Sequence, residues 1–243
     1  MVSKSQIKLI TSLAQKKNRA RLGLFIAEGI KGISELLNSS FQLDTLYTTD
    51  PQFTASSSKT VIITDADLKK ISLLKTPQVA LGVFKIPEPH SPAIEGLSLA
   101  LDGIRDPGNL GTIIRLCDWF GVRELLCSPD TVDCFNPKVV QASMGSISRV
   151  NVNYTDLEKI INANPKTEVF GTFMNGEDVY SSSLPENGIL VLGNEANGIS
   201  SQIENLVSRR IGIPQFGAGS KTESLNVATA TAILLSEFRR RSY

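Results

Sequence analysis

Hydrophobic and polar positions follow one pattern before residue 86 and another after residue 96. The stretch between them reads IPEPHSPAIEG, and its three prolines suppress both helical and strand hydrogen bonding. We therefore predict an extended linker at 86–96, with one domain over residues 1–88 and a second over residues 97–243. A long surface loop inside a single domain is the alternative.

Before the linker, the pattern predicts a small α/β domain. Apolar residues at helical spacing follow Ser3 or Ser5, either of which can cap a helix that starts there. Short apolar runs then alternate with amphipathic stretches. The predicted strands are 22–27, 45–47, 61–64 and 79–85, and the predicted helices are 29–37 and 66–73. Together they indicate a four-stranded sheet covered by helices.

After the linker, apolar strands alternate regularly with helices. The predicted strands are 97–104, 124–127, 150–152, 169–173, 189–192 and 210–213, and the predicted helices are 110–120, 139–144, 157–161 and 224–238. Such alternation is typical of a parallel sheet with both faces covered. Ligands bind to sheets of this kind beyond the carboxyl ends of the strands. The loops that follow the strands are therefore the candidate site.

Two of these loops contain polar residues at suggestive spacing. In the first, 101–121, Asn109 can cap the next helix, and Arg115 six residues later can reach toward the mouth of a site. A surface arginine on an amphipathic helix is the simpler interpretation. In the second, 189–200, Gly193 ends a strand and would let the backbone approach a planar ligand closely. A plain tight turn explains the same residues.

The third loop lies in residues 209–235. There Ile213-Pro214 ends a strand, and Ser224-Leu225-Asn226 opens a helix of small residues. This thin helix suits close packing against another element, with ordinary core packing as the alternative. The run Gly219-Ser220-Lys221-Thr222 looks like the end of a phosphate loop. The full pattern, G-x-x-x-x-G-K-[ST], needs glycine at positions 215 and 220, where this chain has Gln and Ser, so we reject nucleotide binding of that kind.

Composition narrows the class of protein. The 243 residues carry a net charge of +1, with three cysteines and one histidine. This content argues against a disulfide framework and against a Cys/His zinc site, and it favours a cytoplasmic protein. No stretch approaches the ~20 apolar residues that span a bilayer. We therefore expect neither a metal nor a membrane among the partners.

Charge is nevertheless concentrated at the N-terminus. Residues 1–31 hold seven basic residues and one acidic residue, which suits contact with nucleic-acid phosphates. A solvated helix face is the alternative. The candidate RNA-binding residues are Lys16, Lys17, Arg19 and Arg21.

Taken together, the three loops resemble the three motifs of the SpoU/TrmH family, the S-adenosylmethionine-dependent RNA ribose 2′-O-methyltransferases. The matching motifs are Asn109-x-Gly111-x-x-x-Arg115, Leu192-Gly193-Asn194-Glu195-x-x-Gly198, and Ile213-Pro214 followed by Ser224-Leu225-Asn226-Val227. The first domain resembles the ribosomal-protein-L30e-like substrate-binding domain of that family, through 19–22 and 25–29. The loop 215–223 is longer than the family's usual link.

The resemblance implies an α/β fold whose C-terminal domain is a trefoil-knotted parallel sheet of the SPOUT class. It also implies a homodimer, S-adenosylmethionine as cofactor, and RNA as substrate. Ribosomal RNA is favoured over transfer RNA as that substrate. The implied cofactor-binding residues are Gly193, Ile213 and Leu225. The implied catalytic residue that activates the ribose hydroxyl is Arg115. The residues suited to orient Arg115 and the ribose are Asn109, Glu195, Ser224 and Asn226.

The role of Arg115 stays open at this level, because a guanidinium is always charged in proteins and is an awkward base. It could act together with an RNA phosphate, or by positioning and charge stabilisation alone. A methyl group on a sulfonium is already activated, so this chemistry needs no metal. The alternative function is a non-catalytic RNA-binding module on the same scaffold. The full set of five polar residues favours the enzyme.

Overall fold

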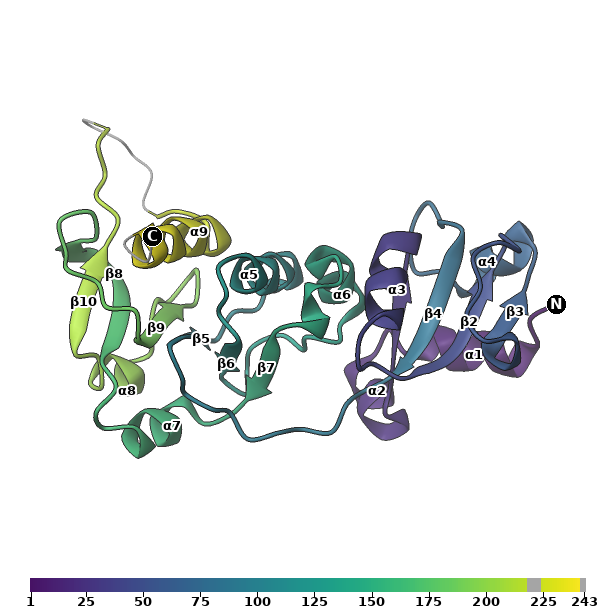
Figure 1. Ribbon diagram of the computed structural model, residues 1–243, viewed down its shortest axis with the longest axis horizontal. Coiled ribbons are helices and arrows are strands. Elements are labelled where there is room, and N and C mark those ends of the chain that lie inside the picture. The colour runs from purple at the N-terminus through teal and green to yellow at the C-terminus, as the bar shows by residue number, and fades with distance from the viewer. Residues whose placement is uncertain (218–223, 241–243) are drawn as a thin grey trace. The chain divides into compact units, whose positions relative to one another are not determined.

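The computed structural model describes residues 1–217 and 224–240. These form two compact units (Figure 1). The N-terminal unit combines Met1–Pro89 with Asp133–Ser148, and the C-terminal unit combines His90–Val132 with Arg149–Tyr243. The sequence pattern contains no signal that 133–148 packs with the N-terminal unit. The domain limits 1–88 and 97–243 stay predictions. Residues 86–95 contain no helix or strand.

The N-terminal unit contains the predicted four-stranded sheet, in the order β1-β4-β2-β3. Its strands are β1 (Leu24–Glu28), β2 (Leu43–Thr48), β3 (Thr60–Ile62) and β4 (Ala80–Lys85). Strand β4 pairs antiparallel with β1 and with β2, whereas β2 and β3 are parallel. The helices are α1 (Lys4–Ser12), α2 (Lys16–Leu22), α3 (Ile30–Leu37) and α4 (Asp65–Ile71), with a 3₁₀ turn at Ser57–Lys59.

Local chemistry explains where these helices begin. Ser3 caps α1 and forms a capping box with Gln6, as the serine pattern predicts. Helix α2 was not predicted, because KKNRARL has too few apolar positions to show a helical period.

The N-terminal unit also contains segment 133–148. There α6 (Pro137–Ser143) and a 3₁₀ turn (Ser146–Ser148) follow Phe135, whose ring contacts those of Phe25 and Phe41.

The C-terminal unit contains a six-stranded sheet, in the order β10-β8-β9-β5-β6-β7, and all its strand pairs are parallel. Its strands are β5 (Leu97–Asp102), β6 (Glu124–Cys127), β7 (Asn151–Tyr154), β8 (Val169–Asp178), β9 (Gly188–Gly193) and β10 (Arg209–Gly212). Its helices are α5 (Pro107–Trp119), α7 (Leu157–Ala163), α8 (Ser201–Glu204) and α9 (Val227–Arg240). Figure 1 shows α5 and α9 on one side of this sheet and α7 and α8 on the other.

Two features of this sheet leave room for a binding site at the carboxyl ends of its strands. Strand β9 lies between β8 and β5, so its carboxyl end opens at the centre of the sheet. In the pairing of β8 with β10, Arg210 lies opposite Gly171 but Ile211 lies opposite Glu177. Residues 172–176 therefore leave the pairing and stand beside the ends of the strands.

The start of α5 corrects one prediction. Asp106, not Asn109, is the N-cap, because its carboxylate accepts the backbone N–H of Asn109 at 2.8 Å and Pro107 occupies the first turn. Asn109 lies inside the helix, so its side chain is available for other contacts. Likewise α9 begins at Val227 rather than at Ser224, because Asn226 Oδ1 accepts the backbone N–H groups of Ala228 and Thr229.

Candidate functional site

A cavity of about 560 Å³ lies beyond the carboxyl ends of β9 and β10. Its walls are mostly apolar, and residues from the excursion of β8 supply one side. The three predicted cofactor-binding residues, Gly193, Ile213 and Leu225, all line it, together with Glu195 and Ser224. Its volume is within the roughly 300–1,000 Å³ typical of small-molecule sites.

Three predicted catalytic residues from distant parts of the chain meet through one side-chain amide. Asn109 Nδ2 donates to Glu195 Oε1 at 2.6 Å, and Asn226 Nδ2 donates to Asn109 Oδ1 at 2.9 Å. These residues come from α5, from the turn after β9 and from the start of α9. Because the amide of Asn109 uses both its oxygen and its nitrogen, its orientation is defined. The network lies at the edge of the cavity, where Glu195 is part of the wall.

The turn that carries Glu195 is held by Asn194, a residue of the second motif to which the sequence alone assigns no role. Asn194 and Gly198 exchange backbone hydrogen bonds of 2.9 and 2.8 Å. The Asn194 side chain accepts the N–H of Ala196 and donates to the carbonyl of Gly103 at 2.6 Å. An asparagine directly after a glycine at a strand end is the signal that could have identified it.

Gly193 is required for a different reason from the one expected. A Cβ atom at this position would lie 2.1 Å from the carbonyl carbon of Gly198 and 2.2 Å from the nitrogen of Ile199. The missing side chain therefore lets the turn fold back over the end of β9. Close approach of a ligand is not needed to explain this glycine.

Arg115 does not join the other predicted catalytic residues within one chain. It is exposed on α5 and does not line the cavity. Arg115 lies six positions after Asn109 on α5, which is ~9 Å along the helix axis and about a third of a turn around it. Within the part of the chain that the structure describes, its guanidinium has neither a hydrogen-bond nor an ion-pair partner.

The predicted RNA-binding residues divide into two groups. Lys16, Lys17 and Arg21 are exposed on α2. Arg19 is only 2% exposed, and its guanidinium is paired with Asp133 and with backbone carbonyls. Burial withdraws this charge from solvent, so we do not count Arg19 among the basic residues exposed to a phosphate.

Two further observations concern metal ions and membranes. Over residues 1–217 and 224–240, no group of three or more His, Cys, Asp or Glu side chains is arranged to hold a metal ion. Across the same ranges, no helix combines the length and the apolar character that crossing a membrane requires.

Comparison with known proteins assigns the chain to a family. Residues 96–236 match the SpoU rRNA Methylase family, and residues 4–82 match the MRM3-like substrate binding domain. The chain therefore belongs to the SpoU rRNA methylase family, and the predicted SPOUT class of α/β fold is confirmed. Most of the long loop 215–223 lies outside the described residues. The predicted knot stays a prediction.

Three relatives illustrate the match. The chain is 29% identical to the 23S rRNA (guanosine(2553)-2′-O)-methyltransferase RlmP of Bacillus subtilis, and the alignment covers 93% of each chain. A TrmH-family protein from Porphyromonas gingivalis is 40% identical, with a TM-score of 0.90 over 99% of each chain. An rRNA methyltransferase from Sinorhizobium meliloti, solved with AdoMet bound, is 29% identical, with a TM-score of 0.88 over 100% of this chain and 98% of that one.

Replacement of Gly193 by alanine should disturb the site through the turn. The added Cβ meets backbone atoms that cannot rotate away, so we expect a loss of about 1–3 kcal/mol in the free energy of unfolding. The displaced turn should also weaken S-adenosylmethionine binding, which calorimetry measures. Gly32→Ala is the control, because a Cβ at Gly32 meets nothing within 4 Å. Normal stability and normal cofactor binding in Gly193→Ala would refute this account of the turn.

Proposed function

We propose that this protein transfers a methyl group from S-adenosylmethionine to a ribose 2′-hydroxyl in ribosomal RNA. The observation that carries the proposal is the network of Asn109, Glu195 and Asn226 at the edge of an apolar cavity lined by the predicted cofactor residues. Membership of the SpoU family supports it. The names of the relatives, two of which are rRNA methyltransferases, favour ribosomal over transfer RNA.

The cavity fits the proposed cofactor. Leu192, Ile211, Ile213, Leu225 and Val227 offer apolar walls for a flat adenine ring and for the carbon chain of the methionine part. The Glu195 carboxylate adds a negative charge that favours a positively charged ligand. When bound, S-adenosylmethionine supplies a methyl group that is already activated by its positive sulfur, and this transfer requires no metal.

The polar residues provide orientation. A side-chain amide held by two partners keeps one geometry, and alignment of a nucleophile with its target accounts for a large part of catalysis in reactions of this kind. We assign to Asn109 and Ser224 the positioning of the ribose, and to Glu195 and Asn226 the positioning of Asn109. In the transfer, the ribose 2′-oxygen would form a bond to the methyl carbon, the methyl–sulfur bond would break to leave S-adenosylhomocysteine, and the hydroxyl proton would pass to solvent water. We assign to the Arg115 guanidinium the stabilisation of the negative charge that develops on that oxygen.

We also propose a homodimer, because the single chain leaves Arg115 outside its own cavity. Trp119 follows Arg115 by four residues and thus lies on the same face of α5. Its side chain is 85% exposed, and tryptophan is enriched in protein interfaces and depleted on free surfaces. A second copy that covers this face of α5 would bury Trp119 and place Arg115 at the interface.

Binding of RNA is assigned to the exposed basic residues of α2, namely Lys16, Lys17 and Arg21. A cytoplasmic location completes the proposal. All three cysteines are buried and none forms a disulfide, as expected in a reducing compartment.

The function is tested at Arg115. We expect Arg115→Ala to lower single-turnover methyl transfer to ribosomal RNA by at least ~10²-fold, because the variant lacks a charge that acts in the transition state. Cofactor affinity should change little, and Arg115→Lys should recover little, because an ammonium lacks the planar fork. Arg123→Ala removes another exposed arginine as control. Activity within a few-fold of wild type in Arg115→Ala would remove Arg115 from the mechanism, and a wild-type protein without activity would favour the RNA-binding module.

The RNA surface is tested by salt dependence. Alanine at Lys16, Lys17 and Arg21 should weaken RNA binding, and the slope of log affinity against log salt should fall by about one for each side chain that no longer neutralises a phosphate. Alanine at Lys159 and Lys166, which are exposed lysines of the C-terminal unit, is the charge control. An unchanged slope in the α2 variant would place the RNA elsewhere.

The homodimer is tested by sedimentation. We expect the mass of a dimer, and Trp119→Ala should raise the dissociation constant at least about tenfold, as is common for buried tryptophans in interfaces. Because Trp119 is the only tryptophan, its fluorescence should shift to shorter wavelength as the dimer forms. Ile62→Ala, which changes an exposed apolar residue of the N-terminal unit, is the control. A monomer at every concentration would contradict the proposal.

A further inference from the structure

Arg210 lies on β10 beside residues 172–176, the bulge of β8 that has no partner on β10. Its guanidinium carbon lies 3.5 Å from the centroid of the Phe173 ring, so the cation covers one face of that ring. The same guanidinium forms an ion pair with Glu204 of α8, and its Nη2 donates to Asn175 Oδ1 at 3.4 Å. Arg210 therefore connects two residues of the bulge to a helix, and all of these residues belong to the C-terminal unit.

The register of the strands explains why the ring and the guanidinium meet. Arg210 lies opposite Gly171 in the parallel pairing of β10 with β8. A Cβ on Gly171 would lie 2.6 Å from a ring carbon of Phe173, so the ring covers this glycine. The Phe173 ring is thereby brought next to the Arg210 side chain, well within the ~6 Å at which a cation is attracted to the face of an aromatic ring.

Two glycines let the backbone of the bulge lie against the end of β10. A Cβ on Gly212 would lie 2.5 Å from the carbonyl oxygen of Phe173, and a Cβ on Gly176 would overlap the backbone of Ile211. Contact of this kind is possible only where side chains are missing on both sides. The bulge is thus placed beside the point at which β10 ends and the chain continues to Ile213.

The bulge forms part of the wall of the 560 Å³ cavity. Thr172, Phe173 and Met174 line that cavity, together with residues of β9 and β10. Phe173 packs against the apolar cluster on the α7 and α8 side of the sheet, whereas Met174 is 66% exposed. A segment with few buried contacts opens easily, so the position of this wall depends on what holds Phe173.

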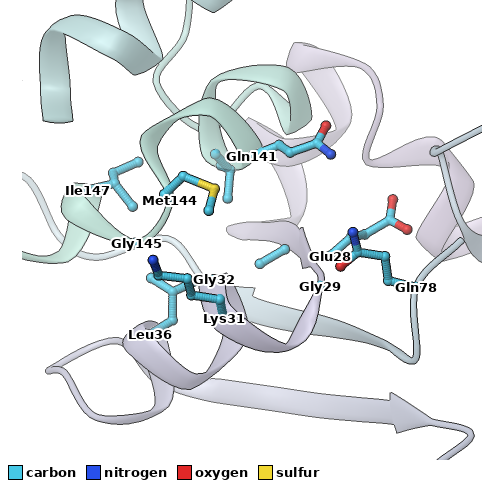
Figure 2. Close-up of a pocket in the computed structure, with 12 residues that line it drawn as sticks. Glu28, Gly29, Lys31, Gly32, Leu36, Gln78, Gln141, Met144, Gly145 and Ile147 are labelled. Atoms are coloured by element: carbon cyan, nitrogen blue, oxygen red, sulfur yellow. The ribbon is translucent and has the colours of Figure 1, made fainter. Parts of the chain in front are cut away.

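A smaller cavity in the N-terminal unit is not a competing site for the cofactor. Figure 2 shows this cavity, which is lined by Glu28, Gln78 and Gln141 among other residues. Its volume is about 100 Å³, well below the roughly 300–1,000 Å³ typical of small-molecule sites. It offers a control position, because Gln141 does not line the larger cavity.

We propose that Arg210 is a positioning residue for S-adenosylmethionine binding. By holding Phe173 and Asn175, it keeps the bulge in the position that forms the cavity wall before the cofactor arrives. The inference rests on the proposed function, because it takes this cavity as the cofactor site. An exposed ion pair alone contributes little. Arg210 differs from such a pair because its guanidinium also covers a ring of the cavity wall.

The first test is the affinity of Arg210→Ala for S-adenosylmethionine, measured by calorimetry below the melting transition. We expect the dissociation constant to rise at least about fivefold, because the apparent affinity falls in proportion to the time that the wall spends in place. Arg210→Lys should recover only part of this loss, since an ammonium cannot lie flat on the ring while it binds both Glu204 and Asn175.

Arg149→Ala is the matched control. The Arg149 side chain is 46% exposed, against 43% for Arg210, and it forms an ion pair with Asp118 at 2.9 Å. Neither Arg149 nor Asp118 lines the cavity. Arg149→Ala should therefore bind S-adenosylmethionine as tightly as wild type does, and so should Gln141→Ala in the smaller cavity.

Variants of Phe173 test whether Arg210 acts through the ring. Phe173→Leu keeps an apolar side chain but has no ring face, and it should also weaken cofactor binding. Phe173→Tyr should recover most of the affinity that Phe173→Leu loses, because a ring is present again. In the double variant Arg210→Ala/Phe173→Leu, the two losses should not add, since each single change already removes the same contact.

Hydrogen exchange without cofactor measures the wall itself. The amides of 172–176 should exchange faster in Arg210→Ala than in wild type, and they should be unchanged in Arg149→Ala. The inference alone is overturned if Arg210→Ala binds S-adenosylmethionine as wild type does, if Arg149→Ala binds it equally weakly, or if the losses add in the double variant. A wild-type protein that does not bind S-adenosylmethionine would overturn the proposed function as well.

Discussion

The side-chain amide of Asn109 is the point on which the candidate site depends. It accepts from Asn226 and donates to Glu195, so it needs three loops to arrive at one place. Hydrogen bonds at an exposed edge each contribute only about 0.5–1.5 kcal/mol, too little to hold three loops together. The sheet must place them first. Asp102 pairs with Gly193, which sets the ends of β5 and β9 side by side, and α9 packs on α5 and brings Asn226.

Neighbouring residues meet the local requirements of the backbone, and this leaves the side chains of Asn109 and Glu195 available for the network. Because Asp106 caps α5, Asn109 is not needed at the helix end. Because Gly193 has no side chain, the turn can fold back so closely that Gly198 lies over it. Because Asn194 satisfies the turn's own N–H groups, the neighbouring Glu195 carboxylate is available to Asn109. Neighbours of the candidate site residues thus satisfy the hydrogen-bonding and steric needs of the backbone. The side chains of the candidate site residues are then available to bind one another and a ligand.

The same division of labour appears on α2, where one charge among four is used internally. Lys16, Lys17 and Arg21 are exposed, while Arg19 is enclosed and balanced by Asp133. Burial of a guanidinium is costly unless its donors are satisfied, and its hydrogen bonds to Asp133, Leu13 and Ala14 meet that requirement. The basic residues of α2 therefore have two different roles. Three of them form an exposed face suited to polyanions, and the fourth forms a buried ion pair.

The sequence by itself determined the elements and the identity of the loops that matter. Apolar periodicity located the strands and most helices, since period and burial are local properties. The resemblance to the SpoU/TrmH motifs singled out Asn109, Glu195, Asn226 and the cavity residues as candidates. Tertiary structure decided which residue caps α5, whether Arg19 faces solvent, and where segment 133–148 packs. These depend on contacts between residues far apart in the chain, such as Arg19 with Asp133, and no local pattern records which distant partner will satisfy a given side chain.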